Sequence, residues 1–232
     1  IITVGPSYRE TVRRVSMEYP EIQFAMINDR TLGQLNISNI YFNENDGAYL
    51  AGVLAASATK RRTVGFVGSE PELFASFNKG VKDTSARVKV LNIPFPDDIS
   101  ALTKSLAKVD IAYSTWDGDA TVLTTIIDNF TGKVRLISEA PDQFFAALPG
   151  AQKVMIARVE KNLVKPIDQL VGAALKGRSI IDVIDETSGI YGREHSVKND
   201  GISLKILTRV AGATAVRSAI SKIKAGKVST RP

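Results

Sequence analysis

The chain has 232 residues, of which 44% are hydrophobic and 23% charged, and a formal net charge of +6. This composition is that of an ordinary globular protein, and the length suits one large or two small domains. The sequence has no cysteine and one histidine, which excludes disulfides, zinc–thiolate sites and cysteine nucleophiles and leaves little room for a Ser–His–Asp triad. The basic residues are scattered without interleaved aromatic residues, so we expect a solvated basic surface and no nucleic-acid partner.

Short β-rich runs alternate with helical patterns along most of the chain. The expected strands are Ile1–Gly5, Ile22–Ile27, Ile37–Phe42, Thr63–Val67, Val88–Ile93, Val109–Ser114, Val134–Ser138 and Lys153–Val159. The expected helices are Ser7–Tyr19, Asp46–Thr59, Glu72–Lys82, Ile99–Ala107, Ala120–Phe130, Val164–Lys176 and Ala211–Ala225. This alternation predicts an α/β protein with mostly parallel strands covered by helices.

Two features of this pattern lead to more specific expectations. The helix at Asp46–Thr59 is rich in glycine and alanine, so we expect it to lie close to a sheet or to another helix. Gly189–His195 and Ile202–Leu207 are expected as a hairpin or as two edge strands. The single histidine, His195, has charged neighbours and is expected in an exposed loop.

Ligands of open α/β sheets bind outside the carboxyl ends of the strands, and this rule selects the candidate residues. The turn after one expected strand carries the only tryptophan, Trp116, beside Asp117. The indole can stack on a planar ring, or it can be half-buried in the surface of the protein. Asp142 follows a later strand, where its carboxylate can accept hydrogen bonds from two vicinal hydroxyls or can serve as a helix N-cap.

Three further candidates lie at other strand ends. Asn28 and Asp29 close the second expected strand and can either contact a ligand or form an Asx turn. Lys161 follows a buried strand and can donate to a ligand or be a plain surface lysine. The strand ends contain no nucleophile–base pair, no metal motif and no phosphate-binding glycine motif, so they favour binding over catalysis and indicate no metal or cofactor.

Three stretches of the sequence resemble the basic membrane protein (BMP) family of nucleoside-binding surface lipoproteins. They are Glu18–Asp29, Tyr41–Ala56 and Thr59–Gly68, and the second is the most specific. Ser138–Gln143 and Glu160–Asn162 are supporting matches, and the similarity thins after about Asp182. The resemblance implies a type I periplasmic-binding-protein-like fold, in which two Rossmann-like lobes are joined by a hinge.

The resemblance also implies a division of the chain. We expect residues 1–44 and 160–200 to form the first lobe, residues 45–159 to form the second, and residues 201–232 to belong to a lobe not yet assigned. Family members begin with two further βα units, and Ile1–Gly5 corresponds to the family's third strand, so the first lobe is expected to be incomplete. Rotation of a few backbone torsions at the crossings between lobes opens or closes such a cleft.

The implied function is capture of a purine nucleoside for an ABC importer, without catalysis. Asp142 would bind the ribose hydroxyls, Lys161 the base or sugar, and Trp116 the face of the base, while Asn28 stands where the family often has aspartate. The implied partners are the nucleoside-like ligand and an ABC permease, and the implied location is extracytoplasmic, at the cell surface or in the periplasm, through a lipid anchor outside this chain. The alternative is a ligand-sensing regulatory protein of the same fold that acts through a partner.

Overall fold

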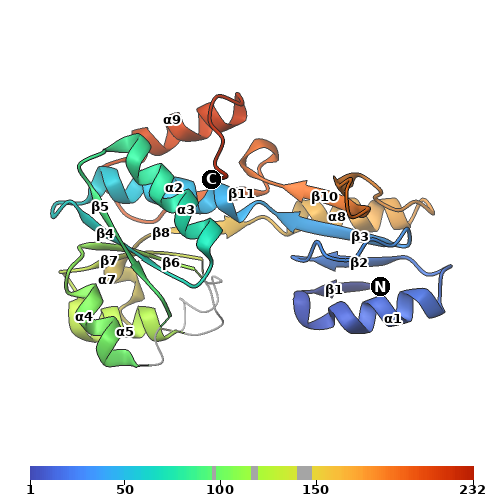
Figure 1. Ribbon diagram of the computed structural model, residues 1–232, viewed down its shortest axis with the longest axis horizontal. Helices are drawn as coiled ribbons and strands as arrows, with labels where there is room; N and C mark the ends of the chain where they lie inside the picture. Colours follow the sequence, from blue (N-terminus) through green and yellow to red (C-terminus); the bar gives the residue numbers. More distant parts are fainter. Residues whose placement is uncertain (96–97, 116–119, 140–147) are drawn as a thin grey trace. The chain divides into compact units, whose positions relative to one another are not determined.

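The computed structural model describes residues 1–95, 98–115, 120–139 and 148–232. These residues form two compact units, and each unit is built from two separate segments of chain (Figure 1). Unit 1 comprises Ile1–Asn43 and Lys161–Ile202, and unit 2 comprises Glu44–Glu160 and Ser203–Pro232. The chain therefore passes between the units three times, after Asn43, Glu160 and Ile202.

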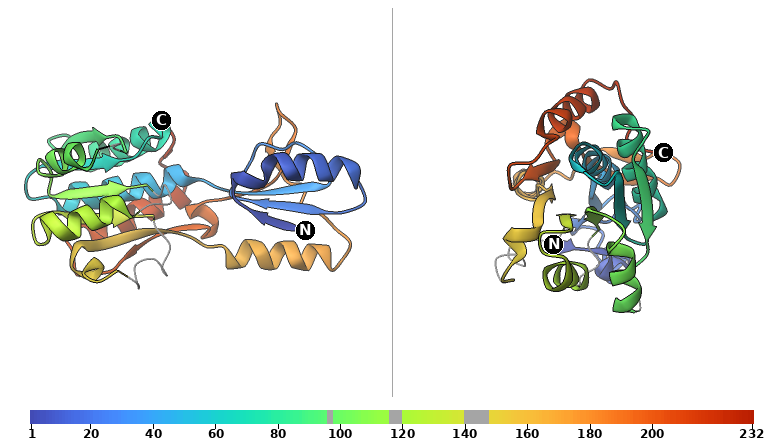
Figure 2. Two further views of the ribbon diagram at one scale, coloured as in Figure 1. Left: turned by 90° about the horizontal axis from the view of Figure 1, so that it is seen from below. Right: turned by 90° about the vertical axis from the view of Figure 1, so that its left-hand side faces the viewer.

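Unit 1 is a sheet with a helix on each face. The strand order is β1-β2-β3-β10-β9, with bounds β1 Ile2–Val4, β2 Phe24–Ile27, β3 Ile37–Phe42, β10 Ile190–His195 and β9 Val183–Asp185. Strands β1, β2, β3 and β10 are parallel, whereas β9 pairs antiparallel with β10. Helices α1 (Arg9–Glu18) and α8 (Val164–Ala174) lie on opposite faces (Figure 2), and η1 (Pro6–Tyr8) and η2 (Val197–Asn199) are short 3-10 turns. Because four strands are parallel, their carboxyl ends share one edge of the sheet.

The positions of β10 and β11 correct the expectation of a hairpin, and of the alternative, two edge strands, only β11 is confirmed. β10 lies between β3 and β9 in the unit 1 sheet, whereas β11 (Ile202–Ile206) is an edge strand of the other sheet, next to β8. Gly192 explains the placement, because a Cβ there would lie 1.9 Å from the backbone oxygen of Asn39. Only glycine allows β10 to approach β3 so closely, and β10 pairs with β3 instead of forming a hairpin with β11.

His195 is buried, so the expectation of an exposed loop is wrong. The residue is 2% exposed, and its ring lies 5.7 Å from the ring of Phe42, centroid to centroid. Its backbone oxygen accepts a 2.8 Å hydrogen bond from the N–H of Asn43, which continues the β3–β10 pairing. Strand pairing therefore turns His195 inward, although Arg193, Glu194 and Lys198 remain partly or fully exposed.

Unit 2 is a doubly wound sheet with helices on both faces (Figure 1). The strand order is β11-β8-β7-β6-β4-β5, with bounds β4 Thr63–Val67, β5 Lys89–Ile93, β6 Ile111–Ser114, β7 Arg135–Ser138 and β8 Met155–Lys161. Helices α2 (Glu44–Ala58), α3 (Pro71–Thr84) and α9 (Ala213–Lys224) cover one face, and α4 (Ile99–Leu106) and α5 (Thr121–Phe130) cover the other. The strand expected from Lys153 begins two residues later, because Ala151–Val154 forms the short helix α7.

The close packing expected for the glycine- and alanine-rich helix is confirmed at the contact between α2 and α3. A Cβ on Gly52 would lie 2.2 Å from the backbone oxygen of Phe77, and one on Gly80 would lie 2.1 Å from that of Tyr49. Each helix thus presses a glycine against the backbone of the other. The small residues are required by helix–helix contact, and α2 is almost entirely buried.

Within the described ranges, no helix has both the length and the apolar character that crossing a membrane requires.

Candidate functional site

The carboxyl edge of the unit 1 sheet brings two predicted site residues together. Asn28 follows β2 in the left-handed backbone region (φ 65°), and its N–H donates to the oxygen of Ile40 at 2.7 Å. Lys161 is the last residue of β8, and its Nζ donates to Oδ1 of Asn28 at 3.4 Å. An amide and an ammonium group from distant parts of the chain therefore share this edge.

Asp29, the next residue, is held by the protein itself. Its side chain is fully buried and accepts hydrogen bonds from Nε of Arg9 at 2.8 Å and from the N–H and hydroxyl of Thr31 at 2.8 and 2.6 Å. The bond to the N–H two residues later is the Asx turn that the sequence allowed. A ligand contact by Asp29 stays a prediction, whereas its role in fixing the loop after β2 is visible in these bonds.

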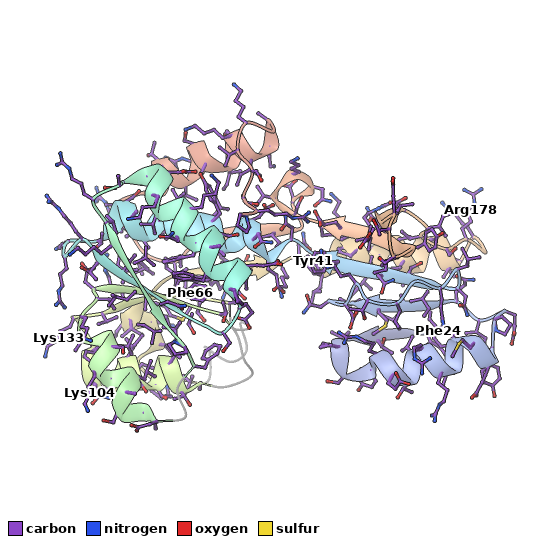
Figure 3. The ribbon with its side chains drawn as sticks, in the orientation of Figure 1. Phe24, Tyr41, Phe66, Lys104, Lys133 and Arg178 are labelled. Carbon is purple, nitrogen blue, oxygen red and sulfur yellow. The ribbon has the colours of Figure 1, made fainter. Side chains whose placement is uncertain are left out.

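An aromatic and a guanidinium group also lie near this edge. The Arg30 guanidinium carbon lies 4.6 Å from the ring centroid of Tyr41, which is near the end of β3. Figure 3 marks both ends of the sheet, with Phe24 at the start of β2 and Tyr41 toward the carboxyl edge. Arg9, Arg30 and Tyr41 were not among the predicted site residues, and the position of Tyr41 one residue before the end of an expected strand was the only available signal.

The carboxyl edge of the unit 2 sheet is rich in carboxylates. Glu70 lies at the start of α3, where its Oε2 accepts from the N–H of Ser69 at 3.1 Å and from the hydroxyl of Thr115 at 3.2 Å. Glu139 directly follows β7, and its Oε1 accepts a short hydrogen bond from the hydroxyl of Tyr113 in β6. These contacts tie the ends of β4, β6 and β7 together through acceptor groups.

Tyr113 is fully buried beneath this edge. Burial is the main cause that raises its pKa well above the ordinary value, and the nearby carboxylates of Glu139, Glu44 and Glu70 add to the rise. A tyrosine in this setting keeps its proton and acts as a hydrogen-bond donor. Sequence reasoning missed Tyr113 because a tyrosine inside an apolar strand is indistinguishable from an ordinary core residue.

Three predicted site residues, Trp116, Asp117 and Asp142, lie outside the described residues. Among the residues that the structure does describe, no group of three or more histidines and carboxylates could hold a metal ion. The described polar groups at both sheet edges can accept and donate hydrogen bonds, as a binding site for a polar molecule requires.

Residues 1–92 match the model of the Bmp family, described as PnrA-like ABC transporter substrate-binding proteins. The match confirms the resemblance noted in the sequence, and it names a family of binding proteins and not of enzymes. It covers α1, β1 to β3, α2 and the beginning of unit 2, up to the strand β5.

Curated relatives support the same assignment over a longer stretch. The "ABC transporter nucleoside-binding protein BmpA" of Lactococcus lactis is 31% identical over 124 residues, or 53% of this chain. The "CD4+ T-cell-stimulating antigen" of Listeria monocytogenes is 30% identical over 119 residues, or 49% of this chain. These alignments span only 31% and 33% of the relatives' own lengths.

Solved structures of similar proteins confirm the fold class. An ABC transporter solute-binding protein from Conexibacter woesei has a TM-score of 0.70 and 18% identity, and covers 98% of this chain and 78% of its own. A protein from Bacillus halodurans described as a transcriptional activator of the comK gene has a TM-score of 0.69 and 16% identity, and covers 97% of this chain and 76% of its own. The chain therefore has the α/β fold of periplasmic-binding-protein type that the sequence predicted.

Proposed function

We propose that this chain is the ligand-binding part of an extracytoplasmic receptor that captures a purine nucleoside for an ABC importer. The observation that carries the proposal is the match of residues 1–92 to a family of ABC transporter substrate-binding proteins. The relative from Lactococcus lactis, which is described as nucleoside-binding, supports a nucleoside as the ligand. The polar carboxyl edges of the two parallel sheets are the places where such a fold binds its ligand.

The proposed contacts use groups of complementary chemistry. Lys161 and Asn28, which lie 3.4 Å apart, offer donors and an acceptor from unit 1, with Asp29 fixing the adjacent loop. Asp142 would accept hydrogen bonds from the two ribose hydroxyls. Trp116 would stack on the base, and Asp117, the next residue in the sequence, would contact the ligand as well. Units 1 and 2 would be the two lobes, and ligand binding would favour a closed arrangement through rotation at the three chain crossings.

The proposed setting follows from the same family. The partner would be an ABC permease that receives the ligand, and the protein would be held at the cell surface or in the periplasm by a lipid anchor outside residues 1–232. The whole protein's import activity belongs to this proposal as well, because the curated relatives extend well beyond the aligned stretch.

Isothermal titration calorimetry with adenosine, guanosine, inosine and ribose tests the ligand. We expect sub-millimolar binding of at least one purine nucleoside and none of free ribose. Asp142→Ala should abolish the binding, whereas Asp128→Ala, an exposed aspartate on α5, should not change it. If the protein binds none of the nucleosides, the proposed ligand is wrong.

A transport assay separates the receptor from the regulatory alternative. Cells that lack the protein should lose uptake of the bound nucleoside and regain it when the gene is restored. Normal uptake in its absence, together with nucleoside binding in vitro, would favour the ligand-sensing regulator.

A further inference from the structure

The ring of Tyr113 is clamped by aromatic neighbours in the core of unit 2. It stacks on Phe77 of α3 with centroids 5.4 Å apart and planes 20° apart, and it meets the edge of Phe66 at 5.7 Å and 62°. Tyr113 is 0% exposed, and Figure 3 shows Phe66 in the same core. Because close packing fixes the side chain in one rotamer, the hydroxyl has one direction available to it. That direction leads to Oε1 of Glu139.

The position of Glu139 allows its carboxylate, which the Tyr113 hydroxyl holds, to contact a ligand. Glu139 directly follows β7 at the edge of the sheet where β4 and β6 also end, and it is half-buried, so solvent molecules reach it. A carboxylate offers about four acceptor sites, and the hydroxyl of Tyr113 occupies one of them. The Tyr113 hydroxyl therefore orients the carboxylate.

We propose that Glu139 accepts a hydrogen bond from an N–H or O–H group of the ligand and that Tyr113 is the positioning residue that orients it. This inference rests on the proposed function and adds a residue to its site. A buried tyrosine hydroxyl commonly donates a hydrogen bond to an acceptor inside the core. The hydroxyl of Tyr113 instead donates to a carboxylate at the carboxyl edge of the unit 2 sheet, where the ligand is proposed to bind. Because Tyr113 already orients the carboxylate of Glu139, less conformational entropy is lost when the ligand binds, and the affinity for the ligand is higher.

The charge at this edge narrows the ligand class. The carboxylates of Glu70 and Glu44, like that of Glu139, raise the pKa of the buried Tyr113, and Glu70 accepts from the hydroxyl of Thr115 at 3.2 Å, so three carboxylates lie at this end of unit 2 although the whole chain carries +6. Such an edge suits an uncharged molecule that presents several hydroxyl or amino donors and disfavours an anion. A nucleoside meets that description through its sugar hydroxyls and the N–H groups of its base.

The experiment measures the affinity of inosine, guanosine and adenosine for the full chain and for the variants Tyr113→Phe, Glu139→Gln and the double variant. Phenylalanine keeps the ring and its packing and removes only the hydroxyl. Tyr49→Phe is the matched control, because Tyr49 is also buried and donates to a carboxylate, Asp83, at 3.1 Å, but on the helices α2 and α3. Melting temperatures of all variants show whether any loss of affinity comes from unfolding.

We expect Glu139→Gln to weaken binding about tenfold, since a charge-assisted hydrogen bond becomes a neutral one. Tyr113→Phe should weaken it about threefold to tenfold, and Tyr49→Phe should have no effect on affinity. In the Glu139→Gln background, Tyr113→Phe should weaken binding by a smaller factor than in the wild type, because the neutral amide that it then orients contributes less to binding.

Three results would overturn the inference, and they can be told apart. If the wild-type chain binds nucleosides and the affinities of Tyr113→Phe and Glu139→Gln are unchanged, the positioning role is wrong and the proposed function survives. If both single variants weaken binding but their effects multiply in the double variant, Tyr113 does not act through Glu139. If the wild-type chain binds none of the three nucleosides, the proposed function fails and this inference fails with it.

Discussion

Replacement of Gly52 by alanine tests the close contact between α2 and α3. The added methyl carbon would lie 2.2 Å from the backbone oxygen of Phe77 and 3.0 Å from the backbone nitrogen of Val81. Ordinary contact begins at 3.4 Å, so the oxygen of Phe77 must retreat by 3.4 − 2.2 = 1.2 Å. The obstacle is backbone inside a helix, so α3 must move as a body. Gly80 presses on Tyr49 at 2.1 Å in the same interface, which prevents relaxation by a simple slide.

The expected cost follows from two opposing effects. Overpacking of a well-filled core costs about 1–3 kcal/mol, and a required backbone shift places Gly52→Ala at the upper end. Alanine in place of glycine returns about 1 kcal/mol through helix propensity. We therefore expect a net loss of about 2 kcal/mol in the free energy of unfolding, taken as the difference between about 3 and about 1 kcal/mol.

Urea unfolding followed by circular dichroism measures this loss. Gly172→Ala is the matched control, because Gly172 lies inside α8 and a Cβ there meets nothing within 4 Å. The control should leave stability unchanged or raise it by up to about 1 kcal/mol. If the two variants have the same stability, α2 and α3 are not in the tight contact described above and the reasoning from the small residues fails.

Two further predictions concern polar groups outside the proposed site. The Asp110 carboxylate accepts from the Thr59 hydroxyl at 2.5 Å and from the N–H groups of Lys60 and Arg61 at 2.6 and 3.1 Å. Asp110→Asn should lower the free energy of unfolding by about 1–3 kcal/mol, because an amide must turn a donor toward one of these donors. Urea unfolding measures the loss against the exposed control Asp128→Asn, and equal stabilities of the two variants would contradict the prediction. His195 should make stability depend on pH. Burial, and to a lesser extent the charges of Arg193 and Lys165, lowers the pKa of His195 in the folded protein from 6.5. The contribution of the neutral imidazole to the free energy of unfolding is therefore complete above pH 6.5 and is lost as the pH falls below that value toward the lowered pKa. Melting curves between about pH 7.5 and 5 should show this loss in the wild type and not in His195→Leu, and parallel profiles would refute it.

The hydrophobic periodicity of the sequence predicted most helices and strands and the parallel arrangement of the sheets. The alternation of apolar runs with amphipathic helices predicts parallel sheets because the inward-facing residues recur with the period of each element. The pairing of β10 with β3 could not be predicted in the same way. It depends on the absence of a side chain at Gly192 opposite Asn39, in strands that are distant in the sequence. The same pairing buries His195, whose charged neighbours gave the opposite indication.

The site shows the same division between local and distant information. The rule for strand ends selects Asn28 and Lys161 from the sequence alone, and their side chains are in contact in the folded chain. The rule does not reveal the partners of Asp29, because Arg9 reaches that carboxylate from a helix on another part of unit 1. Tyr113 was hidden because its role depends on the rotamer imposed by Phe66 and Phe77, which no sequence pattern encodes.

The interleaving of the two units has a consequence for synthesis of the chain. β3 pairs on one side with β2, which is made just before it, but on the other side with β10, where Phe42 lies opposite His195. At about 5–20 residues per second, the ribosome needs roughly 8 to 30 seconds to make the stretch from β3 to β10. Until then, one edge of β3 has no partner strand, while the continuous stretch Glu44–Glu160 of unit 2 has already emerged. Unit 1 is therefore the part whose sheet stays incomplete longest during translation, and a chain that stops before Gly192 leaves that edge of β3 open however well unit 2 has folded.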